Sequence, residues 1–165
     1  MNSTIVIAVG IIVLMALIVW ALVAAASKDA KKRKVAMVGQ LEQLAKAHDT
    51  TIGPSDFMGK KVIAQDVQKG KVFYVDHSDF GNKAEVINIA DVTGCSLVQV
   101  GSKHTESSKS GKVKVQEQID KIQLELSMKT GDKVSLLFYD EVGDGIMEML
   151  PLKEKAEKWK AVFKG

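Results

Sequence analysis

The side chains that could do chemistry in this chain form no recognised catalytic or metal-binding motif. The three histidines, His48, His77 and His104, lie far apart, and none belongs to a His-x-x-x-His or paired-cysteine motif. A zinc site is therefore not indicated. His77, Ser78 and Asp79 place the residue types of a hydrolase triad side by side. Neighbouring residues of an extended segment point in different directions, so a triad would need other partners.

Four acidic residues lie close together near the carboxyl end of the chain: Asp140, Glu141, Asp144 and Glu148. They lack the Asp-x-Asp-x-Asp-Gly order of a calcium loop, so the sequence favours a solvated hairpin end here. No phosphate-binding glycine loop occurs either. We predict no catalytic residue, no metal ligand and no cofactor.

The single cysteine, Cys95, lies in an apolar, strand-like stretch and has no second cysteine to pair with. This suits a reducing compartment, and we expect Cys95 to be a buried small hydrophobe. A nucleophilic role would need a histidine brought close by the fold. One alternative function therefore stays open: an enzyme or small-ligand sensor whose site is assembled from His77, Asp79, Asp91 and Cys95.

The strongest signal for a structural element is an uncharged run of 23 residues, Thr4 to Ala26. A helix of that length reaches roughly 34 Å, at about 1.5 Å per residue, which exceeds the roughly 30 Å of a membrane's hydrocarbon core. A cleavable signal peptide is the competing interpretation, but signal peptides carry their positive charge before the apolar stretch. We therefore expect a transmembrane helix over residues 4–26 and an integral, single-pass membrane protein.

A cluster of basic residues follows this run: Lys28, Lys31, Lys32, Arg33 and Lys34. Because cytoplasmic flanks of membrane spans are basic, we expect the amino terminus outside a plasma (inner) membrane and the remaining domain in the cytoplasm. The cluster could also contact anionic lipid headgroups.

The net charge of the chain comes from this cluster. Residues 28–34 hold five basic and one acidic residue, a net of +4, and residues 35–165 hold 18 basic and 19 acidic residues, a net of −1. These two values sum to the formal +3 of the chain. Because no basic stripe remains outside the cluster, nucleic-acid binding is not expected.

The residues after the run divide into a helix, a linker and a β-rich region. Apolar residues at spacings of three and four predict a juxtamembrane basic and amphipathic helix over residues 27–49, and Gly53-Pro54 marks a linker over 50–56. From residue 57 onward, short apolar stretches separated by turn residues predict antiparallel strands. We expect strands over 61–66, 71–76, 85–89, 96–100, 113–128, 134–139 and 146–150.

Three finer predictions concern the second half of this region. Residues 101–111 contain no apolar residue, which predicts a loop. The apolar positions from Val113 onward change from odd to even numbers, which predicts a bulge or break near Asp120. Asp144-Gly145 is a pair favoured in two-residue hairpin turns.

The chain ends in a predicted amphipathic helix over residues 151–164. Pro151 fits the first turn of a helix. Apolar residues follow at helical spacing, and we expect Ala156, Trp159 and Phe163 to form a structural plug for the core.

Several segments resemble bacterial pleckstrin-homology-like (PH-like) domains, namely Ile87–Val92, Lys121–Met128, Leu136–Asp140 and Ala156–Trp159. The resemblance implies a bent barrel or sandwich of six or seven antiparallel strands over residues 57–165, capped by a carboxy-terminal helix. Uncharacterised bacterial proteins combine such a domain with one membrane anchor. The first hairpin loop has two lysines and no arginine, unlike members that bind phosphoinositides.

The predicted membrane anchor, the small β domain and the lack of a catalytic motif together predict a non-enzymatic function. We expect a docking or scaffolding role at the membrane, with a protein partner at the cytoplasmic face. An exposed strand edge or apolar groove would be the docking feature.

Overall fold

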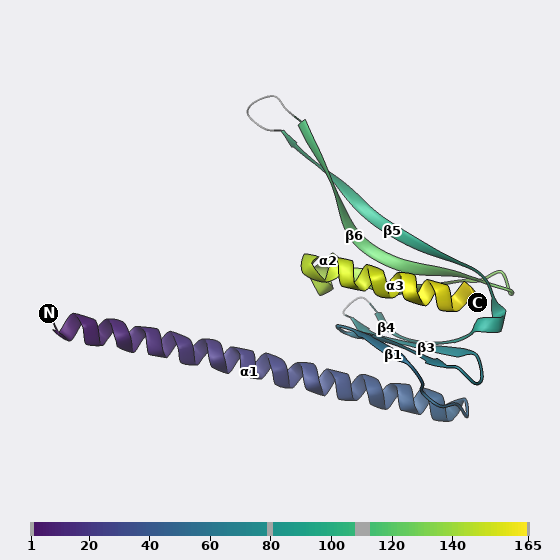
Figure 1. Cartoon of the computed structure of the whole chain (residues 1–165), viewed down its shortest axis with the longest axis horizontal. Coiled ribbons are helices and arrows are strands. Elements are labelled where there is room, and N and C mark those ends of the chain that lie inside the picture. Colours follow the sequence, from purple (N-terminus) through teal and green to yellow (C-terminus); the bar gives the residue numbers. More distant parts are fainter. Residues whose placement is uncertain (1, 79–80, 108–112, 165) are drawn as a thin grey trace. The chain divides into compact units, whose positions relative to one another are not determined.

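The computed structural model describes residues 2–78, 81–107 and 113–164, with side-chain detail for part of them. The chain falls into two compact units, Met1–Gly39 and Gln40–Gly165. Helix α1 (Asn2–Ala47) begins in the first unit and ends in the second, and Figure 1 shows it as one continuous helix.

The predicted membrane span is wrong. Among the residues that the structure describes, no helix is both long enough and apolar enough to cross a membrane. The uncharged run is not a separate element, because its helix continues through the basic cluster to Ala47. The predicted plasma-membrane location, the outside amino terminus, the integral membrane partnership and the lipid contact of the basic cluster all depended on that span and are withdrawn with it.

Helix α1 ends in a turn that satisfies its last carbonyl groups. Asp49 adopts a left-handed conformation (φ 50°), and the Thr50 amide donates a hydrogen bond back to the carbonyl of Ala45 over 2.9 Å. The Thr50 hydroxyl donates to the same oxygen over 3.1 Å. This is the usual way in which a helix end is closed by one left-handed residue.

Four antiparallel strands form the first sheet, in the order β1-β2-β3-β4. Their bounds are Ser55–Met58, Lys61–Asp66, Lys71–Ser78 and Gly81–Asn88. Asp66 closes the turn between β2 and β3, since its carboxylate accepts hydrogen bonds from the amides of Gln68 (2.8 Å) and Lys69 (3.1 Å).

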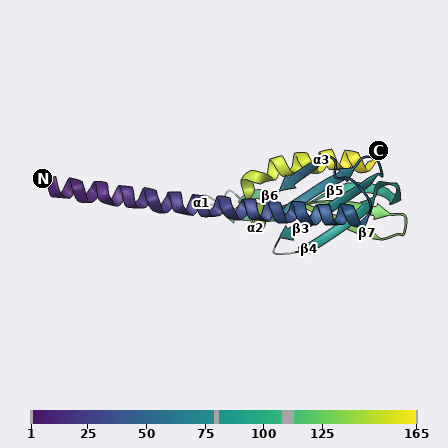
Figure 2. The ribbon, with the colours of Figure 1, turned by 90° about the horizontal axis from the view of Figure 1, so that it is seen from below.

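Both faces of this sheet are buried. Ile63, Val72 and Tyr74 belong to the main core, whereas four residues fully buried on the other face, Val62, Ala64, Phe73 and Val75, do not. The last turns of α1 cover that second face (Figure 2): Leu41 and Ala45 are buried, and the rings of His48 and Phe73 lie 6.4 Å apart.

The second sheet contains β5 (Val92–Ser107), β6 (Val113–Met128) and β7 (Lys133–Asp140), in that order. A 3₁₀ turn, η1 (Ile89–Asp91), connects the two sheets. Strand β7 pairs with residues 121–127 of β6, and β5 and β6 continue past its end as a two-stranded ribbon (Figure 1).

The bulge predicted near Asp120 is confirmed. Val100 pairs with Lys121 and Gly101 pairs with Ile119, so Asp120 is the extra residue of β6. Gly101 is required at this point, because a Cβ there would lie 2.6 Å from the carbonyl oxygen of Gln118. The Asp120 carboxylate accepts a hydrogen bond from the Ser102 hydroxyl over 3.1 Å.

The remaining finer predictions for this region are wrong. Residues 101–107 belong to β5 instead of a loop, because backbone pairing with β6 needs no apolar side chains there; residues 108–112 lie outside the described residues. Asp144-Gly145 forms no hairpin and 146–150 forms no strand. Instead a short helix α2 (Glu141–Asp144) and a 3₁₀ turn η2 (Ile146–Glu148) lead into α3 (Met149–Lys164).

Helix α3 lies against all three strands of the second sheet, along one edge of the pair of sheets (Figures 1 and 2). Four of its residues, Leu152, Ala156, Trp159 and Phe163, are buried in the core that both sheets share. Its polar side reaches edge strand β1: Lys158 and the Trp159 indole each approach an Asp56 carboxylate oxygen at 2.8 Å.

The predicted bent barrel is also wrong, because the described strands form two antiparallel sheets of four and three strands and no closed barrel. Strands β4 and β5 are joined by η1, and no pairing between them completes a ring in the part of the chain that the structure describes. Helix α3 shares the core with both sheets and binds the exposed edge of β1, which is one way to protect an edge strand.

Removing the Trp159 side chain tests the role of α3 in the core. Trp159→Ala should lower the free energy of unfolding by about 3–5 kcal/mol, because it leaves a large cavity beneath a helix that links both sheets. Urea unfolding of the variant and the wild type measures this. A change below about 1 kcal/mol, the size expected at many surface positions, would contradict the structural role.

Asp56 should make stability depend on acidic pH. Burial alone would raise its pKa, but hydrogen bonds from Lys158 and Trp159 outweigh burial and hold the pKa below its ordinary value of 3.8. The stabilisation is therefore fully present above that value and is lost as pH falls through the lower pKa of the folded protein. Between pH 6 and pH 2, the free energy of unfolding of Asp56→Asn should fall less steeply than that of the wild type. Equal pH dependence of the two proteins would contradict the role of Asp56.

Candidate functional site

The residues predicted for a dispersed enzyme or ligand site are not brought together. His77 lies near the end of β3, whereas Asp91 follows Asn88, which pairs with Lys71 at the other end of that strand. The strand advances six residue positions from Lys71 to His77, roughly 20 Å at about 3.3 Å per residue. Asp79 lies outside the described residues.

Two members of that set, His77 and Cys95, lie in structural surroundings that do not favour reactivity. His77 Nε2 lies 2.6 Å from the side-chain oxygen of Gln40, so the ring fastens the end of α1 to β3. Cys95 is half-buried against the main core, and burial raises the pKa of its thiol, an effect that Lys160 and Lys164 partly offset. A raised thiol pKa disfavours the nucleophilic thiolate.

The basic cluster and the helix plug lie on different elements. Lys28, Lys31, Lys32, Arg33 and Lys34 are exposed on α1. Ala156, Trp159 and Phe163 are buried by α3 in the core. The cluster therefore offers charge to a binding partner, and the plug residues do not.

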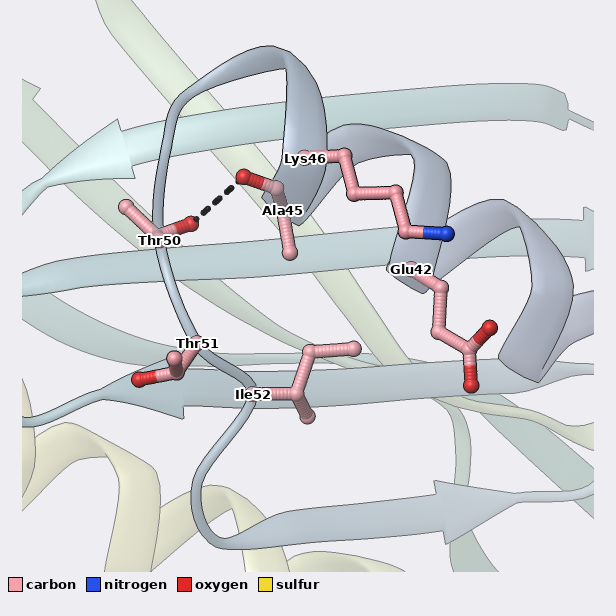
Figure 3. A pocket seen from close by; sticks show the side chains of 6 residues that line it. All are labelled: Glu42, Ala45, Lys46, Thr50, Thr51 and Ile52. Atoms are coloured by element: carbon pink, nitrogen blue, oxygen red, sulfur yellow. Dashed lines mark hydrogen bonds between the residues drawn. The ribbon is translucent and has the colours of Figure 1, made fainter.

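A shallow pocket of about 240 Å³ lies beside the carboxyl end of α1 (Figure 3). Six residues line it: Glu42, Ala45, Lys46, Thr50, Thr51 and Ile52. The Thr50 hydroxyl already donates to Ala45. Ligand sites usually exceed about 300 Å³ and present several converging polar groups, so this pocket is a weak candidate.

The most unusual segment is 140–150, in which polarity is inverted. Asp140 is 3% exposed, whereas Met147 is 90% exposed. Folded chains normally place charged groups outward and large apolar ones inward, so a buried charge beside an exposed apolar group is informative. We therefore take this segment as the candidate site.

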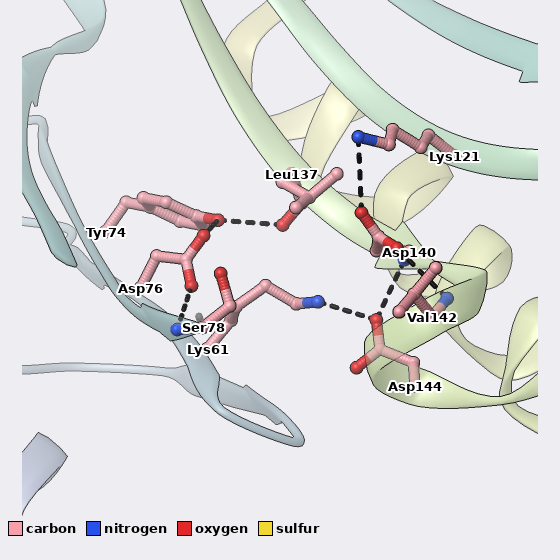
Figure 4. A network of polar contacts seen from close by, with 9 residues as sticks. All are labelled: Lys61, Tyr74, Asp76, Ser78, Lys121, Leu137, Asp140, Val142 and Asp144. Atoms are coloured by element: carbon pink, nitrogen blue, oxygen red, sulfur yellow. Dashed lines mark hydrogen bonds and ion pairs between the residues drawn. The ribbon is translucent and has the colours of Figure 1, made fainter. Parts of the chain in front are cut away.

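A buried ion pair holds the segment in place. Lys61 Nζ, at the start of β2, lies 2.6 Å from Asp144 Oδ2, and the two side chains are 2% and 7% exposed (Figure 4). The same Asp144 oxygen accepts a hydrogen bond from the Asp140 amide over 2.9 Å. Gly59, between β1 and β2, adopts φ +60°, and a Cβ there would lie 3.1 Å from the other Asp144 oxygen.

Asp140 caps the short helix α2. Its Oδ1 accepts a hydrogen bond from the Val142 amide over 3.1 Å, the standard bond of an aspartate at a helix amino terminus. Its other oxygen lies 3.4 Å from Lys121 Nζ. Asp144 is therefore paired with a buried lysine, whereas the Oδ2 atom of Asp140 is buried near the half-exposed Lys121 and accepts no hydrogen bond from the described residues.

Tyr74 makes a further polar contact between the two sheets. The Tyr74 hydroxyl donates to the Leu137 carbonyl of β7 over 2.8 Å and lies 3.3 Å from Asp76 (Figure 4). Burial, and next the charge of Asp76, raise the pKa of Tyr74. The hydroxyl therefore stays protonated and remains a donor that joins β3 to β7.

With its aspartates turned inward, the segment presents apolar side chains to solvent. The exposed fractions are 82% for Val142, 65% for Ile146, 90% for Met147 and 64% for Leu150. We call these four residues the apolar ridge. Glu141 and Glu148 lie beside the ridge in the chain; Glu141 is half-buried and accepts a hydrogen bond from Gln118, and Glu148 is exposed.

The ridge was not predicted from sequence, although one signal pointed to it. Apolar and acidic residues are interspersed from Asp140 to Leu150, which is unusual for a solvated hairpin end. Which set points inward depends on Lys61, which is 83 residues away in the chain. Nothing in the local pattern reveals that partner.

In the part of the chain that the structure describes, no group of three or more histidine, cysteine, aspartate or glutamate side chains could hold a metal ion. Comparison with protein families, with curated proteins and with solved structures finds no match.

Breaking the buried ion pair should be costly. Lys61→Met leaves the Asp144 charge buried without its partner, which should lower the free energy of unfolding by about 3–5 kcal/mol. Lys69→Met is the matched control, because Lys69 pairs with a fully exposed Asp49 at 3.1 Å and should contribute less than about 1 kcal/mol.

A second variant separates the buried charge from other effects of the substitution. Lys61→Met combined with Asp144→Asn should unfold less easily than Lys61→Met alone, since no buried charge remains. Urea unfolding of all four proteins provides the measurement. Equal stability of Lys61→Met and Lys69→Met would contradict the importance of the pair.

Proposed function

We propose that this chain is a non-enzymatic docking protein that binds a partner protein through the apolar ridge. The observation that carries the proposal is the inverted polarity of residues 140–150. Exposed apolar patches next to polar residues are typical of protein-binding surfaces. Burying the ridge under a partner would remove four large apolar side chains from water.

The charges around the ridge indicate the chemistry of the partner. Residues 134–152 contain four acidic residues and no lysine or arginine. Two of the acids are neutralised by Lys61 and Lys121, which leaves Glu141 and Glu148 beside the apolar side chains. A complementary partner is a helix with apolar and basic residues on one face.

The rigidity of the segment supports a docking role. Because Asp144 and Asp140 fasten α2 to β2 and β6, the ridge is presented in one arrangement before a partner arrives. A pre-organised surface loses less conformational entropy on binding than a mobile one.

The resemblance to PH-like domains stays a prediction, since no match tests it. Seven described strands followed by one carboxy-terminal helix are what supports it. The alternative of an enzyme or sensor built from His77, Asp91 and Cys95 gains no support, because these residues lie on separate parts of the fold.

Substitution on the ridge tests the proposal. The probe is a short helical peptide with leucine and lysine on one face, and it is added to the full chain. The control is the same peptide with each lysine replaced by glutamate. Met147→Ser should weaken binding about tenfold, the effect of losing about 1.4 kcal/mol, and should leave stability within about 0.5 kcal/mol of the wild type. Calorimetric titration measures the affinity.

Val67→Ser serves as the matched control variant, because Val67 is an exposed apolar residue (66%) outside the ridge. It should bind the lysine peptide as the wild type does. No binding of the peptide to the wild type, or equal weakening by both substitutions, would refute docking at the ridge.

A further inference from the structure

We propose that the partner is a second copy of this chain, whose α1 helix docks on the ridge through Lys28, Lys31, Lys32 and Val35. This inference rests on the proposed function, because it names the occupant of the same ridge. We call these four residues the basic face.

The spacing of the basic face places its residues on one side of α1. Positions i, i+3, i+4 and i+7 of a helix lie on one face, and Lys28, Lys31, Lys32 and Val35 follow that spacing. All four are exposed, and Val35 is 72% exposed. Arg33 lies on the other side of the helix at this spacing, which makes it a matched control.

Charge complementarity selects this segment as the occupant. Residues 28–34 carry a net charge of +4, and no other segment of the chain has a comparable basic cluster. Residues 140–148 hold four acids in nine positions, the densest acidic run of the chain. Asp140 and Asp144 are paired with Lys121 and Lys61, so the negative charge offered to a partner is that of Glu141 and Glu148. Exposed apolar residues lie beside both segments: Val35 directly follows the basic segment, and the ridge overlaps the acidic one.

The sizes of the basic face and the ridge determine how tightly two copies are expected to bind. One short helix face on a ridge of four residues buries less than the roughly 1,000 Å² that a stable interface needs. Two copies that exchange their basic faces reciprocally about a two-fold axis double the contact. We therefore expect a weak, reciprocal and salt-sensitive pair of chains.

Crosslinking between differently labelled copies tests this arrangement. One copy carries Val35→Cys and the other Met147→Cys, both full-length and both with Cys95→Ser, and a short bis-maleimide joins the two thiols. Mixed copies should crosslink several-fold more than a mixture of Val35→Cys with Val67→Cys. The three side chains that are replaced by cysteine are exposed, and Cys95→Ser exchanges a half-buried side chain for one of nearly the same size, so the variants should keep the fold.

Charge variants then test which residues hold the pair together. Lys31→Glu with Lys32→Glu should abolish the excess crosslinking, and added Glu148→Lys on the ridge copy should restore part of it. Arg33→Glu, on the other side of the helix, should leave the crosslinking largely unchanged.

The outcomes separate this inference from the proposed function. Equal crosslinking at Met147 and Val67, or a link that forms only when both cysteines are on one chain, would overturn docking of a second copy. If the lysine–leucine peptide still binds the ridge in that case, the ridge serves another protein. If the peptide also fails to bind, both proposals are refuted.

Discussion

The buried contact between Lys61 and Asp144 is the interaction on which the arrangement of the second unit depends. It joins the first strand after the β1–β2 turn to the short helix that follows the last strand, across 83 residues of chain. A buried ion pair adds little net stability compared with apolar residues of the same size, but losing one partner is costly. Its effect here is positional: it decides which side of residues 140–150 faces the core.

The orientation of residues 140–150 explains why the surface of this segment resembles a binding site. Asp144 is held inside by Lys61, and Asp140 by the amide of Val142 and the nearby charge of Lys121, while apolar residues of the same segment point outward. As a consequence, Met147 and Ile146 are exposed to solvent. Helix α3 begins at Met149, so its first turn carries Leu150 of the ridge, and Trp159 holds the same helix in the shared core.

Features that depend on local pattern could be predicted from the sequence, and features that depend on distant charges could not. The phase change around Asp120 is visible in a single strand, and the bulge follows from it. The helical spacing of Ala156, Trp159 and Phe163 likewise reveals which face of α3 is apolar. The dipeptide Asp144-Gly145 predicted a hairpin because only its local pattern was considered. The residue that pairs with Asp144, Lys61, lies 83 residues away in the chain. The uncharged run of Thr4 to Ala26 was interpreted alone, although its helix continues to Ala47.

Hydrogen exchange of the full chain, with and without the lysine–leucine peptide, tests the docking role of the ridge most directly. Amides that a partner covers exchange more slowly, and the position of the slowed amides locates the contact. Docking at the ridge predicts slower exchange in residues 141–150, with little change beside the pocket at residues 42–52. Slower exchange at 42–52 instead, or no change at 141–150 when the peptide is bound, would contradict it.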